Sequence, residues 1–245
     1  MKKELFAVTA LAAGMLLADT TPTVTTSNML GFLPVPNTVA KASDMYLVTV
    51  PFCAYEATTE TAISVSEVLQ TANLAVGDEL FIPKGEGAYD NYKLNASKEW
   101  APAKVVTLNA DGSVKTDSGV AAAEATVARG TAFWVKTSAT QINLLGEGVT
   151  AAKGVTVTGG ESAFQWNLIG ATTCTGSLNL GTLVGSAGDV IRLANGTQYR
   201  YNASQSKAGW YKLPVKSDSV KTSDVIPAGV GIWYATKDTR EFSTL

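Results

Sequence analysis

Six short sequence landmarks occur twice in this chain in the same order, and this duplication constrains the fold more than any other feature of the sequence. In the first and second copy respectively they are the segments 45–53 and 166–174, 64–69 and 177–183, 77–82 and 188–193, 92–97 and 199–204, the tryptophans Trp100 and Trp210, and the segments 127–135 and 226–234. An ordered series of this length predicts one structural unit that is present twice, with longer loops in the first copy.

The segments between the landmarks have the composition of β-strands. They are short, rich in Val, Ile, Thr, Tyr and Trp, and separated by Gly, Asn and Asp, which is typical of strands joined by turns. The segment 105–115 adds a hairpin to the first copy, with Asp111-Gly112 supplying the positive φ angles of a tight turn. Helical periodicity is nearly confined to 64–72, where two helical turns are expected.

We therefore expect an all-β fold of two tandem, related β-sandwich or barrel-like units with few short helices. The first unit is expected at 44–150 and the second at 151–245.

The N-terminus has the pattern of an export signal. Two lysines near the start precede an apolar stretch over 7–18 that ends in small residues, which is typical of a signal peptide covering 1–18. The stretch is shorter than the roughly 20 residues that span a bilayer, so no membrane span is expected after cleavage. An apolar terminus that is retained as an assembly helix is the alternative. The pattern predicts a secreted or cell-surface protein.

The segment 19–43 follows as an extended N-terminal arm. It is rich in Thr, spaced by prolines and almost uncharged, and its apolar part, Met29 to Val35, favours extended backbone. A flexible linker and a strand added to a neighbouring sheet are the two interpretations.

Composition excludes several classes of chemistry. The chain has no histidine, which removes the commonest general base and metal ligand, and its net charge of −2 with scattered lysines and arginines argues against nucleic acid. The adjacent pairs Ser97-Lys98 and Ser206-Lys207, and the aspartates of the two Gly-Asp pairs, Asp78 and Asp189, are explained by turns. We therefore expect no catalytic residue, cofactor or metal site, and no enzyme.

Aromatic side chains near the repeated Asn-Ala-Ser segments are the candidate contacts for a ligand or a second subunit. Exposed, coplanar rings could stack on sugars, whereas packing in the core is the alternative for each of them. The candidate residues are Trp100, Trp210, Tyr92, Tyr199 and Tyr201.

The two cysteines, Cys53 and Cys174, occupy equivalent positions in the two copies. If the units pack with twofold symmetry, the cysteines could meet in one disulfide. If the units stack head to tail, as repeats more often do, each cysteine would be buried separately.

The second copy resembles a known β-rich repeat. Trp166-Asn-Leu-Ile-Gly170 opens it and Ile226-Pro-Ala-Gly-Val-Gly-Ile-Trp233 closes it, and this pairing resembles a repeat of secreted and surface proteins of Bacteroidetes-like and Verrucomicrobia-like bacteria. The first copy is similar through Tyr46-Leu-Val-Thr49 and Arg129-Gly-Thr-Ala-Phe-Trp134. The resemblance implies an extracellular setting and an all-β fold, and no catalytic residues.

These observations lead to one expectation about function. We expect a non-catalytic extracellular subunit, structural or adhesive, that assembles with copies of itself into a filament or surface layer through the N-terminal arm. The alternative is a carbohydrate- or mucin-binding module, with glycans as partners.

Overall fold

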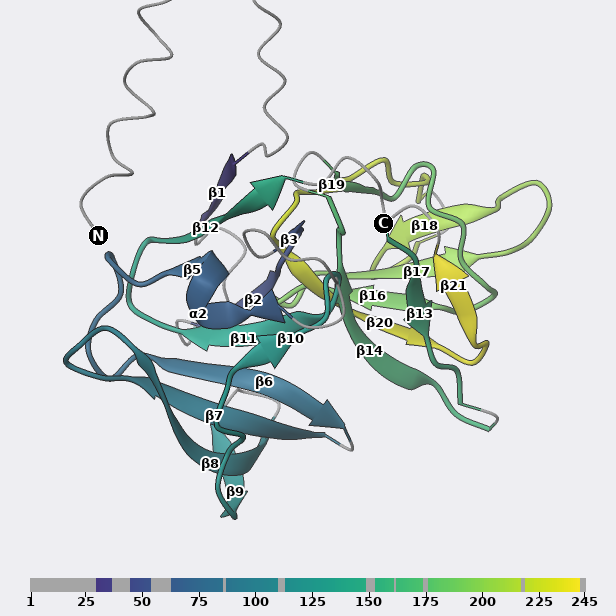
Figure 1. The fold of residues 1–245 in the computed structure, drawn as a ribbon. Coiled ribbons are helices and arrows are strands. Elements are labelled where there is room, and N and C mark those ends of the chain that lie inside the picture. Colours follow the sequence, from purple (N-terminus) through teal and green to yellow (C-terminus); the bar gives the residue numbers. More distant parts are fainter. Residues whose placement is uncertain are drawn as a thin grey trace, which may run out of the picture.

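Antiparallel strands make up nearly all of the regular structure, which confirms the predicted all-β fold class (Figure 1). The computed structural model describes residues 30–36, 45–53, 63–85, 87–109, 113–148, 153–160, 162–173, 176–216 and 219–242. The expected signal peptide, the arm apart from 30–36, and the Asp111-Gly112 turn lie outside the described residues.

The strands of 30–148, here called the first repeat, form three sheets. The six-stranded sheet has the order β2 (Met45–Thr49), β11 (Ala132–Lys136), β6 (Glu79–Gly85), β7 (Ala88–Leu94), β8 (Trp100–Leu108) and β9 (Val114–Ser118). The smaller sheets join β12 (Gln141–Gly148) to β1 (Leu30–Pro36), β3 (Phe52–Cys53) and β5 (Leu69–Gln70), and β4 (Ile63–Ser64) to β10 (Thr126–Val127).

The strands of 153–242, here called the second repeat, form sheets of the same kind. The five-stranded sheet has the order β14 (Gln165–Gly170), β20 (Gly231–Thr236), β16 (Val190–Arg192), β17 (Gln198–Asn202) and β18 (Gly209–Lys212). Two pairs complete it, β13 (Val155–Val157) with β21 (Arg240–Phe242) and β15 (Leu178–Asn179) with β19 (Val225–Ile226).

Strand order in the two repeats is the same once the extra strands of the first are set aside. The order β2-β11-β6-β7-β8 matches β14-β20-β16-β17-β18, β1-β12 matches β13-β21, and β4-β10 matches β15-β19. The register agrees too, because Leu47 lies opposite Trp134 as Leu168 lies opposite Trp233. The structure thus gives the duplicated landmarks of the large sheets the same place in both copies, whereas the segments 64–69 and 177–183 differ, since α2 and β5 occur in the first repeat alone among the described residues.

The described part of the expected arm is a strand of the chain's own sheet. All seven residues of β1 pair antiparallel with β12, and Val35 is 1% exposed while Phe32 points outward. β1 takes the place that β13 takes in the second repeat, so residues 30–36 belong structurally to the first repeat and not to a separate arm.

The expected helix is shorter than predicted. α2 covers only Val65–Val68, a single turn, and the chain then enters β5. Val65 and Val68 are both buried, and β-branched valines at these positions limit helix extension. The predicted hairpin of the first repeat is confirmed by the pairing of β8 with β9.

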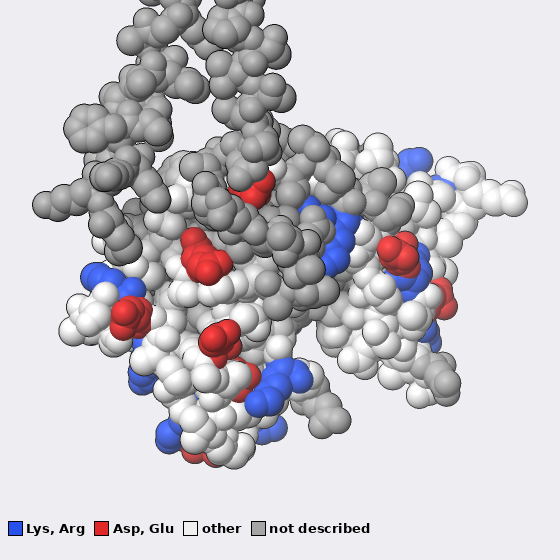
Figure 2. Space-filling view, in the orientation of Figure 1, with Lys and Arg blue, Asp and Glu red and all other residues white. Residues whose placement is uncertain are grey.

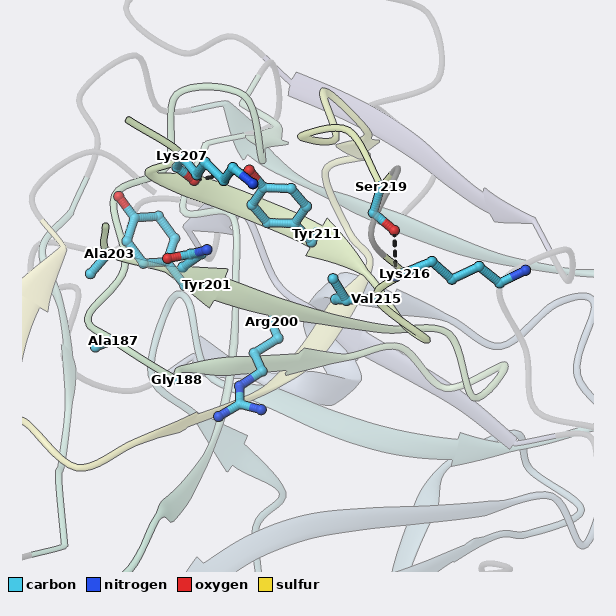
Figure 3. Close-up of a pocket in the computed structure, with 11 residues that line it drawn as sticks. Ala187, Gly188, Arg200, Tyr201, Ala203, Lys207, Tyr211, Val215, Lys216 and Ser219 are labelled. Carbon is cyan, nitrogen blue, oxygen red and sulfur yellow. Dashed lines mark hydrogen bonds between the residues drawn. The ribbon is translucent and has the colours of Figure 1, made fainter. Parts of the chain in front are cut away.

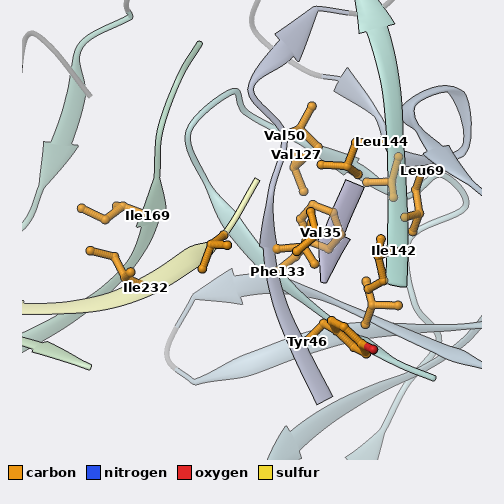
Figure 4. Close-up of a cluster of buried hydrophobic side chains, with 14 of the residues drawn as sticks. Val35, Tyr46, Val50, Leu69, Val127, Phe133, Ile142, Leu144, Ile169 and Ile232 are labelled. Atoms are coloured by element: carbon orange, nitrogen blue, oxygen red, sulfur yellow. The ribbon is translucent and has the colours of Figure 1, made fainter. Parts of the chain in front are cut away.

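The two repeats share one hydrophobic core. A single cluster of buried side chains contains Val35 and Phe133 from the first repeat together with Ile169 and Ile232 from the second (Figure 4). Because the cluster is continuous, neither repeat buries its apolar face without the other.

Reciprocal backbone hydrogen bonds join the two repeats. The N–H of Thr49 donates to the carbonyl oxygen of Gly229 at 2.9 Å, and the N–H of Gly170 donates to that of Gly130 at 3.0 Å. By the strand register Thr49 is equivalent to Gly170, and the two acceptor glycines are equivalent turn residues with positive φ. A contact that is made twice with the roles of the repeats exchanged is the signature of twofold symmetry.

Equivalent residues also meet each other directly. Trp134 and Trp233 pack edge to face with ring centroids 5.0 Å apart, and the isolated bridges Val48–Val230 and Thr131–Ile169 form a second reciprocal pair. The repeats are therefore related by an approximate twofold axis between β2–β11 and β14–β20. The expectation of head-to-tail stacking is wrong, because burying the two closing strands against each other creates the shared core.

The twofold axis makes a testable prediction at Gly170. A Cβ on Gly170 would overlap the γ-methyl of Thr49, its equivalent across the axis, so only one of the two positions can carry a side chain. We expect Gly170→Thr to lower the free energy of unfolding by about 1–3 kcal/mol through overpacking. The exchange Thr49→Gly with Gly170→Thr should recover most of that loss in chemical denaturation. An exchange variant no more stable than the single variant would contradict the symmetry.

Candidate functional site

The aspartates of the two Gly-Asp pairs have the turn role that the sequence predicts. Asp78 Oδ2 accepts from the backbone N–H of Ala75 at 2.8 Å, and Asp189 Oδ2 accepts from that of Ser186 at 2.6 Å. Gly77 and Gly188 precede them with φ of 92° and 85°. Both carboxylates therefore hold a turn before a central strand.

Asp189 is the centre of a larger buried network that Asp78 lacks. Its side chain is 1% exposed, accepts from the hydroxyl of Tyr234 at 2.5 Å, and is ion-paired with Arg240. The guanidinium of Arg240 lies over the rings of Tyr234 and Phe242, at 5.4 and 4.9 Å from their centroids. Burial, and then the hydrogen bond to Asp189, raise the pKa of Tyr234. The arrangement fastens β21 to the five-stranded sheet.

The aromatic residues expected to contact a ligand are buried in the core. The exposed fractions of Trp100, Trp210, Tyr92, Tyr199 and Tyr201 are 9%, 0%, 1%, 3% and 8%. The structure therefore corrects the sugar-stacking interpretation at these positions, since each ring lies on the core side of a sheet, where alternate residues of β7, β8, β17 and β18 point.

The hydroxyl groups of the buried tyrosines also have structural partners. Tyr92 donates to the carbonyl oxygen of Glu124 at 3.0 Å, and Tyr199 donates to Asp224 Oδ2 at 2.7 Å. Burial, and then the charge of Asp90, raise the pKa of Tyr92 to about 12. These equivalent tyrosines fix the loop before β10 and the loop before β19 in the same way.

The backbone of Cys53 pairs with that of Glu147 in β3, whereas Cys174 and the side chain of Cys53 lie outside the described residues. A disulfide between Cys53 and Cys174 therefore stays a prediction.

In the part of the chain that the structure describes, no three His, Cys, Asp or Glu side chains gather in a way that could hold a metal ion. Within the same residues no helix is both long enough and apolar enough to cross a membrane.

The second repeat exposes aromatic side chains that the sequence analysis missed. Trp166 on the edge strand β14 is 47% exposed, and Phe164, just before the strand, is 38% exposed. The Nζ of Lys237 lies 5.3 Å from the centroid of the Phe164 ring. The two exposed rings and the cation beside one of them make this surface a candidate binding site.

Trp166 belongs to a row of side chains on the face of the five-stranded sheet that points away from the core, here called the outer face. The residues lie directly opposite one another across successive strands, and the row reads Trp166, Ala235, Val190, Arg200, Tyr211. Trp166 and Arg200 are three strand spacings apart, about 14 Å. A flat, extended ligand along the row would meet an indole at one end and a guanidinium at the other.

The first repeat has a buried side chain at the position equivalent to Trp166. Met45, the equivalent of Trp166, is 1% exposed, and Phe81, the equivalent of Arg192, is also 1% exposed. Both belong to a second hydrophobic cluster that includes Val106 of β8 and Ala194 of the second repeat. Lys136 and Lys93, which lie in the same row as Met45, are exposed instead. The exposed indole on this face is therefore specific to the second repeat.

Charged side chains are otherwise dispersed over the surface. In Figure 2 the lysines and arginines are interspersed with aspartates and glutamates over the visible face. Three lysines of the first repeat form ion pairs. The Nζ atoms of Lys84, Lys104 and Lys136 lie 3.3, 2.5 and 3.4 Å from carboxylate oxygens of Asp90, Asp117 and Glu79, respectively.

When the two copies are aligned, Trp166 of the second copy stands where the first copy has Met45. The sequence alone does not tell an exposed tryptophan from a larger core residue, because the difference depends on what covers each face of the sheet.

No protein-family model, no curated protein and no solved structure matches the chain.

Proposed function

We propose that this protein is a non-catalytic adhesive protein of the cell exterior that binds carbohydrate on the outer face of its second repeat. The observation that carries the proposal is the exposure of Trp166, at 47%, where the equivalent Met45 of the other copy is 1% exposed. An indole has a large, rigid apolar face, and the C–H groups of a sugar ring present a matching apolar surface. The export pattern at the N-terminus supports the extracellular setting.

The structural roles of the repeated aspartates and of Lys98 favour binding over catalysis. The repeated aspartates hold turns, and Lys98 Nζ donates to the carbonyl oxygen of Leu74. The turns at Asn95 and Asn202 are closed by hydrogen bonds from the backbone N–H of Ser97 and Ser204 at 2.9 Å. These polar side chains contribute to the fold.

β1, the described part of the expected arm, bears on self-assembly. It is paired along its whole length with β12 of its own chain, and Val35 is buried in the common core. We therefore base the adhesive role on ligand binding and not on donation of this strand to a neighbouring copy.

The proposal predicts a large effect of one exposed side chain. We expect the purified protein to bind oligosaccharides on a glycan array, and Trp166→Ala to weaken that binding by about tenfold or more, as for a central aromatic contact. Because Trp166 is half exposed, the free energy of unfolding should change by less than about 0.5 kcal/mol.

Phe32→Ala is the matched control, since Phe32 is 60% exposed on β1 of the first repeat. It should leave glycan binding unchanged. Equal losses in the two variants, or full binding by Trp166→Ala, would refute the assignment of the outer face.

A further inference from the structure

A cavity of about 430 Å³ lies at the β17–β18 end of the outer face (Figure 3). Arg200 of β17 and Tyr211 of β18 line it, together with the loops on either side of β18. Tyr211 is held in place by its hydroxyl, which donates to the carbonyl oxygen of Lys207 at 2.9 Å. The other lining residues include Gly188, Lys207, Val215 and Lys216.

Among the described residues, the lining of this cavity carries cations and no acidic residue. Arg200, Lys207 and Lys216 are exposed, and none of the three forms an ion pair with a described residue. In Figure 3 Lys207 lies beside the hydroxyl end of Tyr211, the guanidinium of Arg200 points away from both, and the Lys216 side chain extends away from the other lining residues. A shallower hollow beside it shares Arg200 and adds Lys212, again without a carboxylate. Positive charge is therefore concentrated here, in contrast to the ion-paired lysines of the first repeat.

Gly188, which lines the cavity, also lies next to the exposed ring of Phe164. A Cβ placed on Gly188 would lie 3.3 Å from Cζ of Phe164 and 3.6 Å from Nη2 of Arg200. The Phe164 ring and the Arg200 guanidinium therefore both lie within van der Waals reach of the same backbone turn.

The first repeat again shows what is specific to the second. Lys93 occupies the position equivalent to Arg200, but Ala101 lies opposite it where Tyr211 lies opposite Arg200. The first repeat therefore has a positive charge at this position but no aromatic ring opposite it. A guanidinium forms paired hydrogen bonds with planar oxyanions, which a lysine ammonium does not.

We infer that this cavity binds the anionic group, a carboxylate or a sulfate, of an acidic carbohydrate whose sugar rings stack on Phe164 and Trp166. The inference rests on the proposed carbohydrate-binding function and adds the class of sugar. Arg200 binds the oxyanion through its guanidinium, and Lys207 contributes a second positive charge. Neutral sugars lack the group that this cavity binds.

Binding to immobilised polymers tests the inference with purified protein. The arms are a polyuronate, a sulfated polysaccharide, a neutral polysaccharide and single-stranded DNA. We expect at least one of the two acidic polysaccharides to bind about tenfold or more tightly than the neutral one, with affinity falling as salt rises. The polyuronate and sulfated arms identify the oxyanion. DNA that binds as tightly as both acidic polysaccharides would overturn the inference, since it would reveal an unselective cationic surface.

Variants separate this inference from the proposed function. Arg200→Gln with Lys207→Gln should abolish the preference for the acidic polymer, whereas Lys93→Gln with Lys115→Gln, which removes the same charge from exposed positions of the first repeat, should keep it. Trp166→Ala should weaken binding to acidic and neutral polymers alike. If Trp166→Ala weakens binding and the Arg200–Lys207 variant does not, the carbohydrate surface stands and the anionic site is refuted. If the reverse holds, the carbohydrate surface is refuted.

Discussion

Replacing Trp210 with alanine is expected to lower the free energy of unfolding by about 3–5 kcal/mol. The side chain is 0% exposed, packs edge to face against Tyr201 and Tyr234 at centroid distances of 5.3 and 5.9 Å, and donates from Nε1 to the carbonyl oxygen of Leu183 at 2.9 Å. Alanine at position 210 would leave a large cavity in the core and would leave the carbonyl oxygen of Leu183 without its donor. The loss is a substantial part of the roughly 5–15 kcal/mol that stabilises an ordinary domain.

Urea unfolding monitored by circular dichroism measures this effect, and Trp166→Ala is the control of the same chemistry. Both variants delete an indole from the second repeat, but only Trp210 is enclosed. A Trp210→Ala protein that unfolds at the same urea concentration as Trp166→Ala would show that Trp210 is not a core residue.

Replacing Asp189 with alanine is the second large effect, a loss of about 3 kcal/mol in the free energy of unfolding. The substitution leaves the Arg240 guanidinium, which is 23% exposed, without its carboxylate, and removes the acceptor of the Tyr234 hydroxyl. Breaking a buried ion pair from one side costs several kcal/mol because the remaining charge is left desolvated. We expect β21 to lose protection first, which hydrogen exchange of the 240–242 amides would detect.

The equivalent substitution Asp78→Ala provides the control. Asp78 accepts from the backbone N–H of Ala75 and from the hydroxyl of Thr137, at 2.8 and 2.6 Å, and no cation among the described residues forms an ion pair with it. We expect the free energy of unfolding to fall by about 1 kcal/mol, because hydrogen bonds are lost but no charged group is left buried without a partner. Equal losses for Asp78→Ala and Asp189→Ala would mean that the ion pair with Arg240 contributes nothing.

The duplication serves as an internal reference throughout the molecule. Residues that agree between the repeats, such as Tyr92 with Tyr199, are buried in both. Residues that differ mark where the copies have diverged, and the exposed Trp166 in place of the buried Met45 is such a change on the outer face.

Local patterns in the sequence determined the fold class and the correspondence between the repeats. Alternating apolar residues, the Gly-Asp turns with positive φ at Gly77 and Gly188, and the repeated landmarks are features of neighbouring residues, so they can be predicted from the sequence. The strand order that follows from them is the same in both copies.

The twofold axis, the place of β1 and the exposure of each tryptophan were decided only by the tertiary structure. Trp166 and Trp210 both stand in apolar, strand-like segments, and nothing within those segments distinguishes the exposed ring from the buried one. Their difference depends on contacts between residues far apart in the chain. Trp210 faces the shared core, whereas Trp166 lies on the opposite face of the same sheet and is half exposed.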